Sequence, residues 1–219
     1  MKPSLNVAEH FISLQGESSF AGKICFFLRL SGCNLRCSYC DTTFAQTKDS
    51  FQQLTINEIV TTINKSNIEL IEITGGEPLL QSEAVNALSE ILIKNRKTVL
   101  IETNGSVLIN KIPEAVIKIV DVKTPSSNEA NSFNIENLKM LNHQDEIKFV
   151  IADRADFDFA AKFTKKHNLE KIVDNIIFSP VWGKINFADL AEWLIAENLP
   201  VRMQLQLHKI IWGPDKQGV

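Results

Sequence analysis

Cysteine is scarce in this chain of 219 residues, which has only four. Secreted domains that depend on disulfides carry many cysteines at spacings along the whole chain, and this pattern is missing here. Three of the four cysteines instead lie between positions 33 and 40. A reducing compartment, in which thiols stay free to bind metal, is the expected environment.

Long apolar runs and a strong net charge are missing as well. No run approaches the roughly 20 apolar residues of a membrane span, and residues 1–6 lack the apolar segment of a signal peptide. Lys and Arg together number 23 and Asp and Glu 26, a formal net charge of −3, which argues against a globally basic nucleic-acid binder. We therefore expect a cytoplasmic protein that binds neither membranes nor nucleic acid.

Apolar β-like runs alternate with helical patterns along the chain. The candidate strands are 24–30, 69–73, 98–102, 117–122, 146–151, 174–178 and 201–206, and the candidate helices are 55–65, 82–95, 135–141, 153–167 and 186–197. An alternating segment at 8–14 predicts one more strand before them. The predicted N-caps of four of the helices are Asn57 or Thr55, Ser82, Asp153 and Asn186. This order predicts an α/β fold with a parallel sheet and crossover helices, open or curled into a partial barrel. Without repeats, low-complexity tracts or linkers, residues 1–219 are expected to form a single domain.

Polar and glycine-rich clusters follow four of the candidate strands. The cysteine loop follows 24–30, and residues 74–78, 103–105 and 123–125 follow the next three. In parallel α/β folds the carboxyl ends of the strands share one rim, where active sites collect. Topology alone therefore places a site at these four strand ends.

The cysteine loop itself offers three thiolates to one site, from Cys33, Cys37 and Cys40. A structural zinc and an ordinary cubane cluster both take four protein ligands, so three would leave one iron of a [4Fe–4S] cluster open. The alternatives are a zinc site completed by a distant histidine and unmetallated core thiols. No histidine has a second ligand at zinc-finger spacing, and Cys25 sits in an apolar run as a core thiol would. The spacing favours the cluster.

The C-x3-C-x2-C spacing, the aromatic Tyr39 between its last two cysteines and the Gly75-Gly76 pair together resemble radical S-adenosylmethionine (SAM) enzymes. The resemblance implies a partial (β/α)6-type TIM barrel with a short N-terminal strand extension. It also implies a [4Fe–4S] cluster on the three cysteines, with SAM bound to the open iron. The SAM contacts that it implies are Tyr39, Cys40, Asp41, Gly76, Lys123, Thr124 and Pro125.

Within that superfamily, five segments resemble the 7-carboxy-7-deazaguanine synthase family. They are residues 11–17, Arg29, Asp41-Thr42, residues 121–125 and residues 206–209. The resemblance implies conversion of 6-carboxy-5,6,7,8-tetrahydropterin to 7-carboxy-7-deazaguanine with loss of ammonia, a lyase reaction of queuosine biosynthesis in which SAM is regenerated. The substrate contacts that it implies are Leu14, Gln15, Gly16, Arg29 and Thr74, with Thr42 as a ligand of Mg2+.

This resemblance further implies a small-molecule pterin substrate, a reducing partner such as flavodoxin or ferredoxin, and a homodimer. Two other classes stay open from the residues. An activating enzyme of the same superfamily would abstract hydrogen from a glycine of a partner protein and would need neither residues 14–17 nor Arg29. An electron carrier or zinc module would close the site with a fourth cysteine. The roles of Glu17, Glu77 and His208 are undecided from the sequence.

Overall fold

In the computed structural model, which describes residues 3–47 and 51–219, the described strands form one nine-stranded sheet in the order β3-β1-β2-β4-β5-β6-β7-β8-β9. The strands are β1 Ser4–Leu14, β2 Ile24–Leu30, β3 Gln52–Thr55, β4 Leu70–Gly75, β5 Thr98–Thr103, β6 Ile117–Asp121, β7 Glu146–Ile151, β8 Asn175–Pro180 and β9 Arg202–Met203. From β2 to β9 every neighbouring pair is parallel, whereas β1 pairs antiparallel with both β2 and β3.

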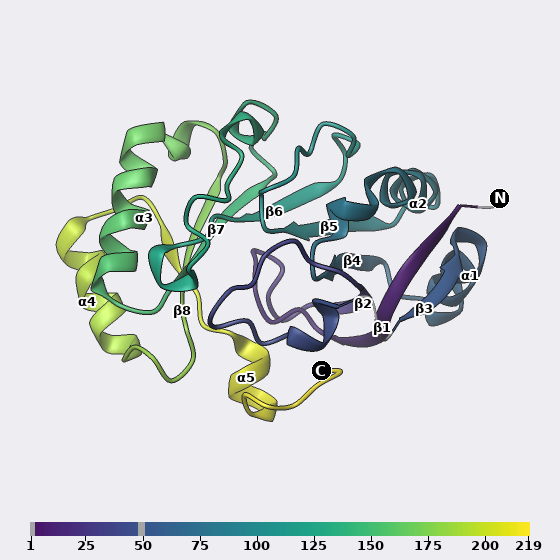
Figure 1. The fold of residues 1–219 in the computed structure, drawn as a ribbon, viewed down its shortest axis with the longest axis horizontal. Coiled ribbons are helices and arrows are strands. Elements are labelled where there is room, and N and C mark those ends of the chain that lie inside the picture. The colour runs from purple at the N-terminus through teal and green to yellow at the C-terminus, as the bar shows by residue number, and fades with distance from the viewer. Residues whose placement is uncertain (1–2, 48–50) are drawn as a thin grey trace.

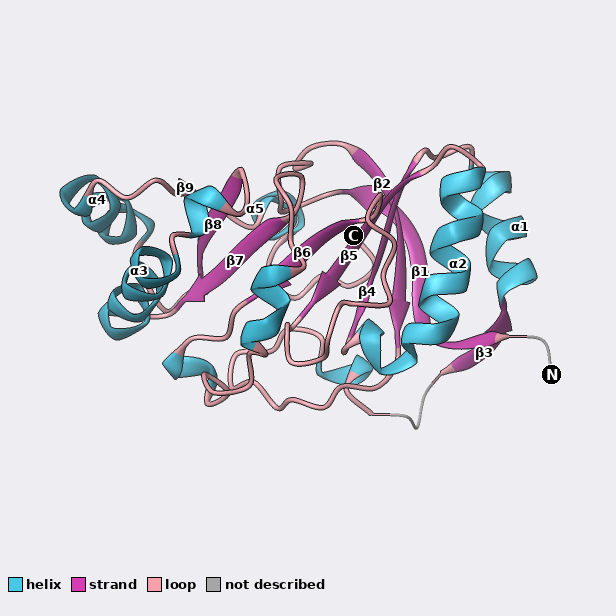
Figure 2. Cartoon of the chain, turned by 90° about the horizontal axis from the view of Figure 1, so that it is seen from above, coloured by secondary structure: helices cyan, strands magenta, loops and turns pink. Residues whose placement is uncertain are grey.

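The sheet curls into an open, partial barrel whose convex side carries the helices (Figures 1 and 2). The helices are α1 Ile56–Ser66, α2 Ser82–Lys94, α3 Arg154–His167, α4 Phe187–Glu197 and α5 Leu207–Trp212. Helices α1 and α2 lie at the end near β1, and α3 and α4 lie at the end near β8 (Figure 2). The expected α/β partial barrel with an N-terminal strand extension is confirmed, and β1 is that extension.

Local signals explain where two of these helices begin. The Thr55 side chain accepts a hydrogen bond from the Glu58 amide while the Glu58 carboxylate accepts from the Thr55 amide, a capping box that starts α1. Asp153 caps α3 through a single bond, because its side chain accepts from the Asp156 amide at 2.9 Å. Ser82, a predicted N-cap, is instead the first residue of α2, and the cap position Gln81 makes no side-chain cap bond.

Two apolar layers hold the helices to the sheet, and a third fills the inside of the barrel. One layer packs α1 and α2 on strands β2 to β5, and another packs α3 and α4 on β7 and β8. The inner cluster consists of Cys25, Phe27, Leu70, Leu100 and Ile119. Cys25 is fully buried in it, as a core thiol. This apolar plug closes one end of the barrel interior and leaves the carboxyl ends of the strands open for a site.

Two candidate elements differ in extent from the structure, and two short elements were missed. Residues 135–141, a candidate helix, form a shorter 3-10 helix at Ile135–Lys139. The strand expected at 201–206 is limited to β9, two residues long, after which the chain turns into α5, which was not predicted. The four-residue strand β3 was also missed. Each of these segments is too short for its periodicity to be read, and tertiary contacts decide its form.

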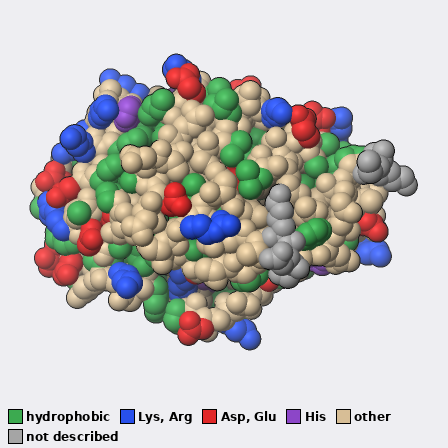
Figure 3. Space-filling view, viewed as in Figure 1, with side chains coloured by type: hydrophobic (Ala, Val, Ile, Leu, Met, Phe, Trp, Pro, Cys, Tyr) green, Lys and Arg blue, Asp and Glu red, His purple; other side chains and the backbone are tan. Residues whose placement is uncertain are grey.

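No helix among the described residues is long and apolar enough to cross a membrane. On the face seen in Figure 3, acidic and basic side chains lie intermixed, and they are most frequent toward the end formed by α3 and α4. This distribution agrees with the near balance of positive and negative residues in the sequence.

Candidate active site

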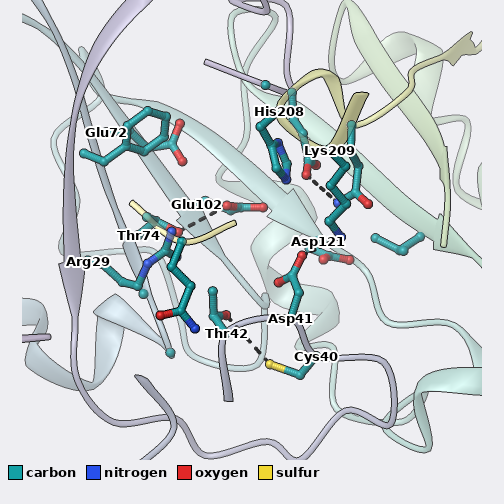
Figure 4. A pocket seen from close by; sticks show the side chains of 18 of the residues that line it. Arg29, Cys40, Asp41, Thr42, Glu72, Thr74, Glu102, Asp121, His208 and Lys209 are labelled. Carbon is teal, nitrogen blue, oxygen red and sulfur yellow. Dashed lines mark hydrogen bonds and ion pairs between the residues drawn. The ribbon is translucent and has the colours of Figure 1, made fainter. Parts of the chain in front are cut away.

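A cavity of about 550 Å³ opens inside the barrel at the carboxyl ends of the parallel strands. Its wall combines the β1–β2 loop, the cysteine loop, the ends of β4 to β7, and the C-terminal segment from Gln206 onward. Figure 4 shows Arg29, Thr74 and Glu102 close together on one side, with His208 and Lys209 across the cavity. The site therefore lies at the rim that the strand-end clusters predict.

Most of the predicted site residues meet at this cavity. Those that line it are Leu14, Gln15, Gly16, Arg29, Cys33, Cys37, Tyr39, Cys40, Asp41, Thr42, Thr74, Gly76 and Lys123. Thr124 and Pro125 are not among the described residues that line it. Thr124 is fully buried, donates its hydroxyl to the Val150 carbonyl at 2.8 Å, and lies 3.3 Å from the Tyr39 hydroxyl, so it supports the wall from behind.

The three loop cysteines are half-buried free thiols. Burial raises the pKa of Cys33 and also that of Cys37, the latter to about 11. Two N–H donors point at the Cys33 sulfur, the Leu35 amide at 3.4 Å and the Asn104 side-chain amide at 3.8 Å. Hydrogen bonds of this kind stabilise thiolate sulfur in iron–sulfur sites.

The donor set fits a cluster better than a single ion. Within residues 3–47 and 51–219 no three His, Cys, Asp or Glu side chains converge closely enough to hold one metal ion. In a cubane each thiolate binds a different iron, so its ligands need not converge on one point. The Lys123 ammonium near Cys37 adds a positive charge beside thiolates.

Lys123 is held in place by Asp121 at the end of β6. The two form an ion pair at 2.8 Å with both side chains largely buried, and it is Asp121 that raises the pKa of Lys123 against the opposing effect of burial. The other Asp121 oxygen is buried without a partner among the described residues. Since Asp121 also lines the cavity, this unsatisfied acceptor is available to a polar group of a ligand.

The glycine pair lets β4 end against the cysteine loop. Gly75 has a φ of +138°, and a Cβ there would overlap the backbone of Leu30. At Gly76 a Cβ would overlap the Gly32 carbonyl, while its amide donates to the Leu30 carbonyl at 3.0 Å. Only glycine allows so close an approach at these two positions.

Glu77, whose role the sequence left open, is a structural carboxylate. It is fully buried and accepts hydrogen bonds from the Leu79 amide at 2.9 Å, the Thr103 hydroxyl at 2.8 Å and the Asn104 amide at 2.7 Å. Burial raises its pKa although these donors oppose the rise. Glu77 thus ties the end of β4 to the end of β5 below the cysteine loop.

Replacing Glu77 with alanine is expected to lower the free energy of unfolding by about 3 kcal/mol, since three buried donors lose their acceptor. Chemical denaturation of the metal-free protein measures this. Glu90, exposed on α2, is the matched control, and Glu90→Ala should change stability by less than about 0.5 kcal/mol. Equal effects of the two substitutions would contradict the structural role of Glu77.

Arg29 projects from β2 into the cavity, where the Glu9 carboxylate binds its Nε at 2.8 Å. The guanidinium also lies 5.9 Å from the centre of the Phe11 ring. One nitrogen edge is therefore used within the protein, which orients the planar group and leaves its other donors for a ligand.

The β1–β2 loop is fitted closely to the C-terminal segment. A Cβ at Gly16 would overlap the His208 ring, and the Gly16 carbonyl accepts from the Leu207 amide at 2.9 Å. Burial lowers the pKa of His208, which keeps its imidazole neutral in the cavity. Lys209 forms an ion pair with Asp41 at 2.7 Å and so links α5 to the cysteine loop. The C-terminal segment thus closes the site, which its sequence alone does not reveal.

The sequence analysis missed a buried charge network in the middle of the barrel. Lys148 on β7 forms ion pairs with Glu17, at 2.9 Å, and with Glu102. Burial raises the pKa of Glu17, but the Lys148 ammonium and a hydrogen bond from Gln206 outweigh it and lower the pKa to about 2. The sequence contains one signal for this network. Lys148 and Glu72 are charged residues within apolar strands, at positions whose side chains point into the barrel.

Comparison with known proteins agrees with this geometry. The model of the radical SAM superfamily matches residues 28–194. The 7-carboxy-7-deazaguanine synthase of Koribacter versatilis is 44% identical over 98% of this chain and 100% of its own length. That of Chlorobaculum tepidum is 43% identical over 98% of this chain and 97% of its own.

The chain belongs to the 7-carboxy-7-deazaguanine synthase family of the radical SAM superfamily. The solved structure of QueE from Escherichia coli shares the fold with a TM-score of 0.76, at 24% identity, over 94% of this chain and 95% of that one. SuiB from Streptococcus suis, solved bound to S-adenosylmethionine, shares the fold more distantly, with a TM-score of 0.53 over 80% of this chain and 44% of its own. Membership of the 7-carboxy-7-deazaguanine synthase family implies a [4Fe–4S] cluster and SAM.

Proposed function

We propose that the chain converts 6-carboxy-5,6,7,8-tetrahydropterin to 7-carboxy-7-deazaguanine with loss of ammonia, as a carbon–nitrogen lyase of queuosine biosynthesis. The observation that carries the proposal is the 44% identity to a 7-carboxy-7-deazaguanine synthase along the whole of that protein. The activating-enzyme alternative is disfavoured by the same match, and by a cavity into which both Arg29 and residues 14–16 project.

Cys33, Cys37 and Cys40 would hold three irons of the cluster, and the fourth would take SAM. When bound, the cluster and SAM would supply the radical chemistry, with SAM acting as a regenerated cofactor. The residues proposed to contact SAM are Tyr39, Cys40, Asp41, Gly76 and Lys123. Thr124 and Pro125 would act behind them, Thr124 through its contact with Tyr39.

Arg29 would bind the carboxylate of the substrate. Its guanidinium reaches the cavity from β2 and is already oriented by Glu9. Bidentate binding of a carboxylate by a pre-oriented guanidinium is strong and directional. Leu14, Gln15 and Gly16 would face the pterin ring from the opposite loop, and Thr74 would contact it from the end of β4.

Thr42 is the proposed protein ligand of Mg2+. Thr42 lines the cavity, and its hydroxyl makes no cap bond to the 3-10 helix that follows. Among the described residues, the hydroxyl has one hydrogen-bond partner, the Cys40 sulfur at 3.8 Å. The oxygen is thus available to a hard cation, which completes its shell with water and substrate oxygens. Mg2+ bound there would neutralise the substrate carboxylate beside Arg29.

Thr42→Val keeps the shape of the side chain but removes its hydroxyl oxygen. The substitution is expected to abolish most of the stimulation of the rate by Mg2+, a loss of about tenfold or more in that stimulation. Titration of Mg2+ in steady-state assays measures this. Thr43→Val, at an exposed neighbouring position, is the control and should leave the Mg2+ response unchanged. A Thr42→Val enzyme with the wild-type response would exclude Thr42 as the ligand.

The reducing partner, the homodimer and the cytoplasmic location stay predictions. The proposed function is tested with anaerobically reconstituted protein, SAM, Mg2+, a chemical reductant and 6-carboxytetrahydropterin. Mass spectrometry should detect 7-carboxy-7-deazaguanine, with ammonium released in equal amount. Reductive cleavage of SAM without any deazapurine would leave the superfamily in place and overturn the proposed substrate.

A further inference from the structure

Three carboxyl groups and one ammonium share the centre of the barrel. Glu17, Glu72 and Glu102 line the same cavity as Lys148. The ammonium is paired with two of the three, Glu17 at 2.9 Å and Glu102. Glu72 has no ion pair among the described residues. Figure 4 shows its carboxyl directed into the cavity, near that of Glu102.

The hydrogen bonds of Glu72 leave one of its oxygens for a ligand. Its side chain is nearly buried, with 3% of the residue exposed, and one carboxyl oxygen accepts from the side-chain nitrogen of Gln15. The direction of this bond is determined by Gln15, whose own oxygen accepts from the Glu17 amide at 3.0 Å. The second oxygen of Glu72 has no partner in the described part of the chain, and the residue lines the cavity.

The surrounding charges disfavour an ionised Glu72. Burial and the neighbouring Glu102 carboxylate raise its pKa well above the usual range, and Glu17 adds to the rise. Two cations oppose it, but Lys148 is already paired twice and Arg29 is bound by Glu9. The remaining neighbour from β2, Cys25, is a thiol whose pKa is raised chiefly by burial, so it supplies no positive charge. A third negative charge here would lack a counter-charge.

We propose that Glu72 is a neutral carboxylic acid that donates its O–H to an acceptor on the pyrimidinone ring of the pterin, while its carbonyl holds Gln15 in place. This inference rests on the proposed function and assigns a specificity residue that the family motifs do not include. Since the carbonyl oxygen of a neutral Glu72 already accepts from Gln15, the O–H on its second oxygen is the group left for an acceptor on the ring. An ionised Glu72 could only accept and would find no partner in a ring acceptor.

Infrared spectroscopy tests the proton directly. The reconstituted wild-type protein should show the carbonyl band of a protonated carboxyl group, and Glu72→Gln should lack it. Glu90→Gln, at an exposed position of α2, should keep the band. Identical spectra of the wild type and Glu72→Gln in this region would overturn the proposal.

Binding of 6-carboxypterin, a stable fluorescent analogue with the same ring edge, tests the recognition. Glu72→Ala loses both hydrogen bonds and is expected to bind about tenfold more weakly than Glu72→Gln, whose amide keeps a donor and an acceptor. Wild-type affinity should fall as pH rises through the pKa of Glu72, and Glu72→Gln should lack that fall. Equal affinities of the two variants, or the same pH dependence in Glu72→Gln and wild type, would contradict the role. Because Glu72→Gln is nearly isosteric, the test does not depend on Glu72→Ala folding.

The outcomes separate this inference from the proposed function. An enzyme that forms 7-carboxy-7-deazaguanine but lacks the infrared band overturns the role of Glu72 alone. An enzyme that shows the band but binds no 6-carboxypterin and forms no product overturns the proposed function, and the recognition role of Glu72 with it.

Discussion

Cys37→Ala is expected to leave a folded protein that binds no [4Fe–4S] cluster and cleaves no SAM. The three loop thiols line one cavity, and each would ligate a different iron, so two cannot hold the cubane. Iron and sulfide analysis after anaerobic reconstitution, together with the visible absorption of the cluster, measures the loss. Activity should fall to background.

The fourth cysteine provides a matched control. Cys25 is fully buried in the apolar cluster inside the barrel, and it is not among the described residues that line the cavity. Cys25→Ala should therefore keep the full iron content and SAM cleavage, at a cost of about 1 kcal/mol in stability. Retention of the cluster in Cys37→Ala, or its loss in Cys25→Ala, would contradict the assignment of the ligands.

Arg29→Met is expected to lower kcat/KM for 6-carboxytetrahydropterin on the order of 100-fold or more. The variant removes the proposed charge partner of the substrate carboxylate at a position where only 16% of the Arg29 side chain is exposed, and breaking a largely buried pair is costly. It also leaves Glu9 without its 2.8 Å partner. Arg29→Lys should recover part of the loss, because it restores the charge but not the planar fork.

A substrate control makes this prediction specific. Affinity for pterin, which lacks the carboxylate, should be nearly the same for the wild type and Arg29→Met, whereas affinity for 6-carboxypterin should differ strongly. Arg154→Met, at a half-exposed position on α3, should change neither. A similar loss of affinity for both ligands in Arg29→Met would indicate a structural role for Arg29 and contradict the carboxylate clamp.

Local patterns determined which parts of the fold could be predicted. Strand β2 and strand β7 lie where the apolar runs place them, and α3 and α4 begin directly after their predicted caps, Asp153 and Asn186. Residues 135–141 were expected to be helical, and they form the short 3-10 helix Ile135–Lys139. Over so few residues the apolar spacing does not distinguish the two helical forms. Helix α5 is positioned by contacts with the β1–β2 loop, which is distant in the sequence. Gln206, the residue before α5, donates a hydrogen bond to Glu17, and these two residues are 189 positions apart.

The residues of the candidate site also differ in whether the sequence could predict them. The cysteine loop and the glycine pair follow strands in sequence, so the rule for strand ends placed them at one rim. Glu72 and Lys148 lie within strands, and only the curling of the sheet brings them together with Glu17. A single sequence marks both as charged residues of apolar strands, but it does not show that they meet. Thr124 is the opposite case. It was predicted to contact SAM, but its side chain lies behind the wall of the cavity, where it contacts Tyr39 and the Val150 carbonyl.

The most direct measurement uses 6-carboxytetrahydropterin deuterated at ring carbon 6, with reconstituted enzyme, SAM, Mg2+ and reductant. Mass spectrometry of one sample follows the pterin, the deazapurine and SAM together. We expect 7-carboxy-7-deazaguanine to form over many turnovers while SAM persists and acquires deuterium. Cleavage of SAM without 7-carboxy-7-deazaguanine would show that this chain does not contract the pterin ring.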